Sequence, residues 1–136
     1  MPQLPIPNVP TFATHLQGSD PRRLQVVALC AEWCGTCRGF RPLLARLAEV
    51  HADVAFSWLD VEDEAEHAGD LDVETFPCLA VFRDGVPLYF GAVVPLEDVV
   101  GRLVRSLAEP GAAVADVPED VWRLGRTLVR GVERDT

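Results

Sequence analysis

The sequence predicts an α/β domain in which a central mixed β-sheet is flanked by helices, plus an extra helix near the C-terminal end. Three observations lead to this fold class. They are a nearly continuous apolar run, helical spacing of apolar residues directly after it, and an Asp84-Gly85 turn between two later apolar runs. The chain has 136 residues, which is the size of one domain and is large enough to fold without disulfides.

The first strand and a long helix are expected in the N-terminal half. Residues 1–10 hold four prolines and should form an extended arm, and a short helix is expected over residues 11–17. The apolar run Leu24–Cys30 is typical of a central parallel strand that is buried on both faces. From Thr36 to about His51 the spacing predicts a helix that is kinked at Pro42. The apolar face of this helix comprises Phe40, Leu43, Leu44 and Leu47.

The alternation of strands and helices continues in the second half. Val54–Leu59 is typical of a strand, and residues 60–74 form an acidic segment with eight carboxylates that should face solvent as helix and loop. Strands over residues 78–82 and 87–92 are expected to form a hairpin. A helix should open at Pro95. Its apolar face comprises Leu96, Val99, Val100, Leu103 and Leu107.

We divide the chain into an arm (1–10), a domain (11–108) and a linker with an amphipathic helix (109–136). This last helix should begin at Pro118. Its apolar stripe comprises Val121, Leu124, Leu128 and Val132. Its opposite side carries Arg123, Arg126, Arg130 and Arg134. Two interpretations stay open: the helix packs back on the same domain or hangs partly disordered, or it docks a partner or forms a dimer.

The charge balance excludes several functions. Twenty-one acidic and 12 basic residues give a net charge of −9, which argues against binding nucleic acid or an anionic membrane. All basic residues are arginine, so Schiff-base chemistry and a P-loop lysine are excluded. The sequence has neither an apolar run of about 20 residues nor a visible secretory signal, so we expect a cytoplasmic protein.

Cys34-Gly35-Thr36-Cys37 lies at the junction between the first strand and the long helix. The CxxC spacing puts both sulfurs on one side of the first helical turn, within reach of each other. The helix dipole and the unpaired N–H groups there favour a thiolate, which should lower the pKa of Cys34. Cys34 could then attack a disulfide, and Cys37 could resolve the mixed disulfide.

Two other interpretations of the CxxC motif remain. A zinc half-site would need two more ligands, and the other cysteines, Cys30 and Cys78, are single. An inert buried pair is the other possibility, although Trp33 and Gly35 indicate an exposed turn. The redox interpretation is the favoured one, and no metal site is expected.

The segment around these cysteines resembles the thioredoxin family. The resemblance covers about residues 11–108 and rests on Ala31-Glu32-Trp33-Cys34-Gly35-Thr36-Cys37, on Pro42, and on Thr75-Phe76-Pro77 before a hairpin. It implies a thioredoxin-like fold and a protein-disulfide reductase or isomerase activity. The redox-active Cys34–Cys37 disulfide would then carry the electrons without an organic cofactor.

The resemblance also assigns roles to single residues and implies partners. The proline that matches Pro77 is cis in the family and faces the redox pair, whereas an isolated X–Pro bond favours trans. The partners would be protein or small-molecule disulfides and a reductase or another dithiol donor, in electron transport and cell redox homeostasis. The implied substrate-binding residues are Trp33, Gly35, Thr36, Phe76 and Pro77.

Four positions depart from thioredoxins proper. Thr36 replaces a proline, and Ala28 stands where a buried aspartate lies beneath the second cysteine. Cys30 occupies a position that is usually aromatic, and Cys78 one that is usually threonine. Cys30 and Cys78 fall on adjacent expected strands, so they could form a second thiol pair, a regulatory disulfide or a relay. The alternative is that both are small buried hydrophobic residues.

Oxygen and imidazole ligands in the acidic segment raise the question of a metal site. The segment lacks the spacing and the glycine of an EF-hand, so a solvated face is favoured over a metal site. His15, His51 and His67 are scattered and form no catalytic pattern with a cysteine.

The sequence therefore predicts a thiol-disulfide oxidoreductase. A binding or chaperone-like assembly protein with the same fold, in which the redox pair is secondary, is the alternative. A small zinc module is a third hypothesis.

Overall fold

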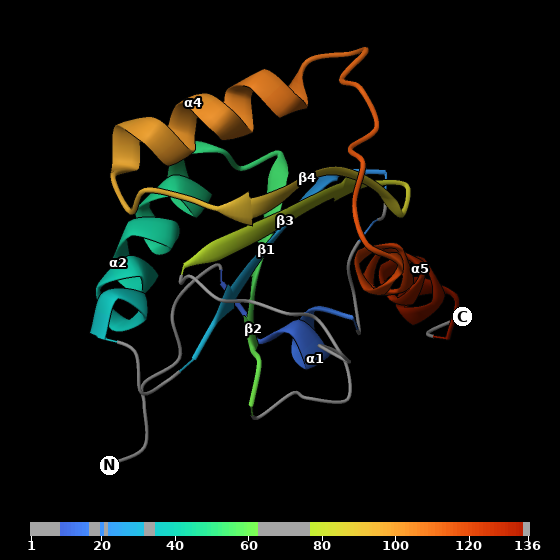
Figure 1. Ribbon diagram of the computed structural model, residues 1–136, viewed down its shortest axis with the longest axis horizontal. Coiled ribbons are helices and arrows are strands. Elements are labelled where there is room, and N and C mark those ends of the chain that lie inside the picture. Colours follow the sequence, from blue (N-terminus) through green and yellow to red (C-terminus); the bar gives the residue numbers. More distant parts are fainter. Residues whose placement is uncertain (1–8, 17–19, 21, 32–34, 63–76, 135–136) are drawn as a thin grey trace.

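The computed structural model describes residues 9–16, 20, 22–31, 35–62 and 77–134, and Figure 1 shows a β-sheet with helices on both sides. The four strands are β1 (Leu24–Cys30), β2 (Val54–Asp60), β3 (Cys78–Arg83) and β4 (Val86–Ala92). Their order in the sheet is β2-β1-β3-β4. β1 runs parallel to β2 and antiparallel to β3, and β3 and β4 form an antiparallel hairpin. The predicted mixed sheet is confirmed.

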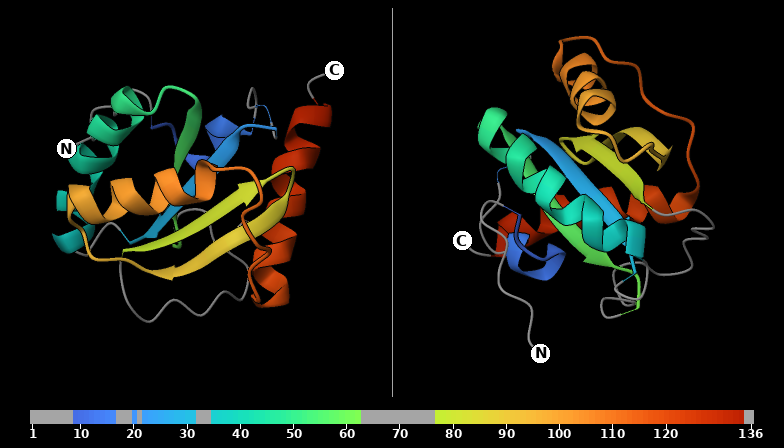
Figure 2. Two further views of the ribbon diagram at one scale, coloured as in Figure 1. Left: turned by 90° about the horizontal axis from the view of Figure 1, so that it is seen from above. Right: turned by 90° about the vertical axis from the view of Figure 1, so that its left-hand side faces the viewer.

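In the described part of the chain, helices cover both faces of the sheet, as the views in Figure 2 show. α2 (Gly35–Val50) and α4 (Glu97–Ala108) lie on one face, and α1 (Phe12–His15) and α5 (Glu119–Arg134) lie on the other. This arrangement buries both faces of β1, and successive side chains of a strand point to opposite faces. Val26, Ala28 and Cys30 therefore pack toward α2, whereas Val27 and Leu29 pack toward α5.

The element boundaries lie close to the predicted ones. β1 has the predicted limits, and α2 begins one residue before the predicted start and contains Pro42. α4 begins at Glu97 rather than at Pro95, because Leu96 keeps an extended backbone with φ −119° and ψ 133°. α1 is shorter than the expected helix over residues 11–17, and the hydroxyl of Thr11 caps it. Residues 63–74 of the acidic segment lie outside the described residues.

The hairpin turn confirms the interpretation of the Asp-Gly pair. Asp84 has φ 56° and Gly85 has φ 78°, both in the left-handed region. A two-residue hairpin loop with the right-handed twist of its strands requires positive φ at both central residues. Aspartate tolerates this conformation and glycine adopts it freely, so the pair sets the turn.

The extra C-terminal helix packs on the domain that precedes it. Val121, Leu124 and Leu128 are each at most 1% exposed and belong to the core cluster between the sheet and α5. Gly125 lies so close to the β3–β4 turn that a Cβ there would overlap the carbonyl oxygen of Gly85. The first interpretation of the stripe therefore holds for these three residues. In the described part of the chain, no helix has the length and the apolar character needed to cross a membrane.

Candidate functional site

The predicted redox motif lies where β1 ends and α2 begins. β1 ends at Cys30, and α2 begins at Gly35, so Cys37 lies in the first turn of the helix. The helix has no acidic residue in its first turn. The helix dipole therefore favours negative charge at this end, without a carboxylate of the first turn to oppose it. Trp33 and Cys34 lie outside the described residues.

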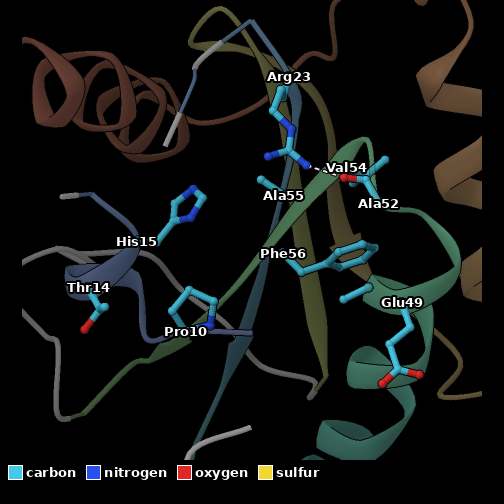
Figure 3. Close-up of a pocket in the computed structure, with 10 residues that line it drawn as sticks. Pro10, Thr14, His15, Arg23, Glu49, Ala52, Val54, Ala55 and Phe56 are labelled. Carbon is cyan, nitrogen blue, oxygen red and sulfur yellow. Dashed lines mark hydrogen bonds between the residues drawn. The ribbon is translucent and has the colours of Figure 1, made fainter. Parts of the chain in front are cut away.

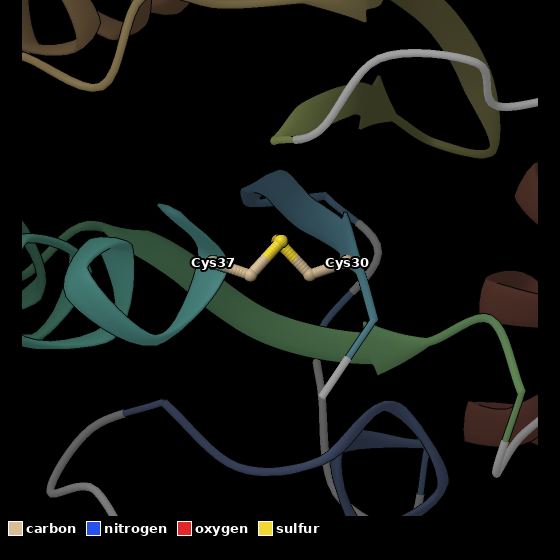
Figure 4. The surroundings of a disulfide bond; sticks show 2 residues. All are labelled: Cys30 and Cys37. Carbon is tan, nitrogen blue, oxygen red and sulfur yellow. A yellow bond between two sulfur atoms is a disulfide. The ribbon is translucent and has the colours of Figure 1, made fainter. Parts of the chain in front are cut away.

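Cys37 is joined to Cys30 in a disulfide that Figure 4 shows between the end of β1 and the start of α2. The two Cα atoms are 5.8 Å apart, within the usual range of about 4.4 to 6.8 Å for a disulfide. Both residues are completely buried. The sequence predicts a Cys34–Cys37 disulfide, so the structure differs from that prediction in the partner of Cys37.

Cys37 pairs with Cys30 because the two residues lie on the sides of β1 and α2 that face each other. Cys30 lies on the α2 side of β1, because it is two and four residues away from Ala28 and Val26 on the same face. Cys37 lies on the buried side of α2, together with Phe40 and Leu44. These two buried faces meet where the strand and the helix join, and this brings the sulfur atoms of Cys30 and Cys37 together.

Among the described residues, the disulfide belongs to an apolar core cluster, and a buried carboxylate lies on the neighbouring strand. Ala28 is completely buried in the same core cluster as both cysteines, where the family carries an aspartate. Asp60 is the register partner of Cys30 on the neighbouring strand and is only 7% exposed. It accepts a hydrogen bond from the backbone N–H of Glu62 at 2.9 Å. Nothing in the sequence distinguishes Asp60 from the other acidic residues of its segment, because only the β1–β2 register places it next to Cys30.

The other accessory thiol lies on the opposite face of the sheet. Cys78 is a buried free cysteine at the start of β3, which neighbours β1 as expected. Its side chain belongs to the core cluster on the α5 side, whereas Cys30 belongs to the cluster on the α2 side. Burial raises the pKa of Cys78 to about 11, although the backbone of Gly91 opposes this. The structure therefore pairs Cys30 with Cys37 and leaves Cys78 as a protonated thiol near neutral pH.

The remaining predicted site residues lie near the same edge of the sheet where they are described. Gly35 and Thr36 are exposed in the first turn of α2. Leu29 pairs with Cys78, which places Pro77, one residue earlier, at the edge where β1 ends. Pro77 is buried, and its carbonyl accepts a hydrogen bond from the N–H of Val93 at 3.1 Å. Phe76 lies outside the described residues, and the cis form of Pro77 stays a prediction.

A cavity of about 680 Å³ lies at the other end of β1 and α2 (Figure 3). Arg23 in its wall donates hydrogen bonds to the carbonyl oxygens of Ala52 at 2.5 Å and Asp53 at 3.2 Å. His15 is buried beside it and is hydrogen-bonded to Gln25, and burial lowers the pKa of His15. None of the predicted site residues that the structure describes lines this cavity. Within the described residues, no group of three histidine, cysteine or acidic side chains could hold a metal ion.

The fold and the cysteine site together define a class of redox proteins. In this class, cysteines lie where a central strand ends and where the next helix begins. The family model described as thioredoxin matches residues 6–99. The chain therefore belongs to the thioredoxin family and is a thiol-disulfide oxidoreductase. This membership favours the redox interpretation over the binding and zinc alternatives.

Individual relatives agree with this assignment. The thioredoxin Asp f 28 of Aspergillus fumigatus is 33% identical over 84 residues, which are 62% of this chain and 71% of that protein. The thioredoxin of Gallus gallus is 31% identical over 100 residues, covering 71% of this chain and 94% of that protein. A solved thioredoxin structure from Nicotiana alata has a TM-score of 0.64 and 20% identity, covering 80% of this chain and 100% of that one. Because the identity to the Nicotiana alata structure is only 20%, this similarity shows the fold alone.

Proposed function

We propose that this protein reduces disulfides through Cys34 and Cys37, with Cys34 as the nucleophile and Cys37 as the resolving thiol. The observation that carries the proposal is the position of Cys37, which lies buried in the first turn of α2, where its sulfur forms a disulfide with Cys30 and is thus able to take part in disulfide exchange. The CxxC spacing and the family membership support the assignment of Cys34 as its reaction partner. In a dithiol of this kind, the residue nearer the helix start is the more accessible one.

The exchange proceeds in two balanced steps. The Cys34 thiolate attacks one sulfur of the substrate disulfide, and the other sulfur leaves as a thiolate and takes up a proton. The Cys37 sulfur then gives up its proton and attacks the Cys34 sulfur, so that the second substrate thiol is released. The substrate gains two electrons, and the protein retains one disulfide. A dithiol donor such as a reductase returns the electrons, so no organic cofactor is involved.

The proposed substrate surface surrounds the exposed start of α2. Gly35 and Thr36 are exposed there, and Pro77 lies at the same edge of the sheet. Trp33 and Phe76 adjoin these residues in the sequence, and the family places an extended substrate along the backbone before the proline. We therefore assign substrate contact to these five residues and expect protein or small-molecule disulfides as substrates.

Reduction of insulin with dithiothreitol as electron source tests the assignment. Cys34→Ser should abolish insulin reduction, whereas Cys37→Ser should accumulate a mixed disulfide with insulin through Cys34. Cys78→Ala is the matched control, because it removes a buried cysteine from the other face of the sheet. Trapping of the substrate through Cys37 in place of Cys34 would overturn the assignment.

We also propose that this protein acts in the cytoplasm. A cytoplasmic compartment fits a thiol reductase, because its glutathione and reductase systems keep dithiols reduced. A role in electron transport and redox homeostasis would follow from this location. The redox state of the four cysteines after acid quenching of cells tests it, since a largely oxidised protein would exclude a reductant role.

Docking of a partner or a second copy through α5 would use the outer side of this helix. The three described stripe residues are buried against the sheet, and Arg123 and Arg126 form ion pairs with Asp120 and Glu119 on the same helix. A pull-down with and without residues 112–136 tests docking. Equal capture by both forms would show that α5 is not part of the surface that binds a partner.

A further inference from the structure

We propose that Cys30 is a third redox thiol, which takes over the disulfide from the CxxC motif by exchange at Cys37. This inference rests on the proposed function of Cys34 and Cys37 and goes beyond it. It implies two oxidised forms of the protein. One carries the Cys34–Cys37 disulfide, and the other carries a buried Cys30–Cys37 disulfide with Cys34 as a free thiol.

The first argument is the geometry of the observed disulfide (Figure 4). Cys30 is the last residue of β1 and Cys37 lies in the first turn of α2, with their Cα atoms 5.8 Å apart. Both elements are fixed by the same core cluster, to which the two cysteines themselves belong. The sheet and the helix therefore hold the two sulfurs within bonding distance, and Cys37 has a covalent partner that the CxxC motif alone does not provide.

The second argument separates Cys30 from the other buried cysteine. Cys78 lies on the neighbouring strand, but its side chain points to the opposite face of the sheet. Two thiols on opposite faces of a sheet cannot reach each other without displacing a strand. Cys30 is thus the accessory thiol that the fold directs toward Cys37, and Cys78 serves as an internal control.

The step needs no further oxidant or reductant. The Cys30 thiol loses its proton and attacks the Cys37 sulfur, a new Cys30–Cys37 bond forms, and the Cys34–Cys37 bond breaks. Cys34 leaves as a thiolate and takes up a proton. The number of disulfides is unchanged, so substrate oxidation and this transfer are separate events. The transfer moves the stored disulfide to two side chains with no solvent exposure, where an external dithiol has poorer access.

The sequence allows a direct chemical test. Trypsin cleaves after Arg23 and Arg38, and an endoproteinase specific for glutamate cleaves after Glu32. Cys30 then lies in peptide 24–32, whereas Cys34 and Cys37 lie together in peptide 33–38. A Cys30–Cys37 disulfide links the two peptides, and a Cys34–Cys37 disulfide leaves them separate.

The reduced full-length protein is mixed with excess insulin, quenched with acid at successive times, alkylated with N-ethylmaleimide and digested. We expect unlinked peptides with an internal disulfide first, followed by linked peptides in which Cys34 carries the alkyl group. Cys30→Ala should lose the linked pair entirely, and Cys78→Ala should retain it. Wild-type protein that shows the internal disulfide alone at all times, or linkage through Cys34, would overturn the inference.

A second arm separates this inference from the proposed function. Diamide, a thiol oxidant, replaces insulin, so disulfides form whether or not the protein reduces a substrate. Linked peptides with alkylated Cys34 in this arm, together with inert behaviour toward insulin, would support the Cys30–Cys37 pair and contradict the proposed function. Insulin reduction without linked peptides in either arm would leave the proposed function standing and overturn the role of Cys30.

Discussion

Gly125 is the position at which one added methyl group tests how α5 docks on the sheet. A Cβ on this residue would overlap the carbonyl oxygen of Gly85 and lie 3.0 Å from Cδ2 of Phe82. Neither neighbour can move easily, because Gly85 belongs to the hairpin turn with φ 78° and Phe82 is completely buried. We expect Gly125→Ala to push α5 away from the hairpin and to destabilise the protein.

Two opposing effects set the size of the change. Alanine in a helix interior is favoured over glycine by about 0.8 to 1 kcal/mol. Overpacking costs about 1 to 3 kcal/mol, and a shift of α5 would expose part of a stripe whose side chains contribute about 1.5 to 3 kcal/mol each. We expect a net loss of about 2 kcal/mol in the free energy of unfolding. With an unfolding entropy of about 2.1 cal/mol/K per residue for 136 residues, Tm should fall by about 7 °C.

Thermal unfolding followed by circular dichroism measures this change against a matched variant. Gly39 lies in the interior of α2, and a Cβ there would meet nothing within 4 Å. Gly39→Ala should therefore raise Tm by about 3 °C, since only the helix propensity acts. Insulin reduction should be retained in Gly125→Ala, because this residue lies on the opposite face of the sheet from Cys30 and Cys37. If Gly125→Ala raised Tm as Gly39→Ala does, the close docking of α5 on the hairpin would be refuted.

Three further predictions address the extra helix, the missing carboxylate and the free thiol. Deletion of residues 112–136 should lower Tm and leave insulin reduction intact, because it uncovers the core cluster on the α5 side, whereas Cys30 and Cys37 lie in the cluster on the other face; loss of exchange would contradict this. Ala28→Asp should speed the resolution of the mixed disulfide near neutral pH, because a carboxylate can accept the Cys37 proton. The same substitution should lower the free energy of unfolding by about 3 to 5 kcal/mol, because it places an unpaired charge in the core. Single-turnover decay of the mixed disulfide across pH measures it, and equal rates in both proteins would mean that another group already takes the proton. Burial raises the pKa of Cys78 from 9.0 to about 11, so the unfolded chain binds fewer protons and the free energy of unfolding should fall as pH rises from about 9 to 11. The contribution of this thiol to the slope is at most about 1.4 kcal/mol per pH unit. Guanidinium titrations of Cys78→Ala should show the slope reduced by this contribution but not abolished, because burial also raises the pKa of Tyr89. An unchanged slope would show that Cys78 does not carry the predicted pKa shift.

The secondary structure and the redox motif were predictable because they depend on neighbours in the sequence. The uninterrupted apolar run Leu24–Cys30 gave the limits of β1, and the positive φ that Asp84 and Gly85 tolerate gave the hairpin turn. The cysteine motif could also be located, because it stands between the end of a buried apolar run and the start of a helical pattern. The start of α4 was less well predicted, since Pro95 is compatible with a first helical turn but does not require one.

The side on which each cysteine lies could be predicted only in part. Alternation along β1 separates Cys30 from Leu29, but the sequence does not say which face α2 will cover. The antiparallel register of β1 and β3 places Cys78 opposite Leu29 and therefore on the other face from Cys30. Adjacent strands alone had suggested that these two thiols could meet.

The sequence by itself determined the α/β class, the strand and helix segments, and the family through a motif of a few consecutive residues. The tertiary structure decided the order of the strands, the pairing of Cys37 with Cys30, the position of Asp60 beside Cys30, and the packing of α5 on the hairpin. The physical reason is the range of the interactions. Turn conformation and helix periodicity are local properties of the chain. Strand register and the meeting of buried faces depend on which distant segments exclude water from each other most completely.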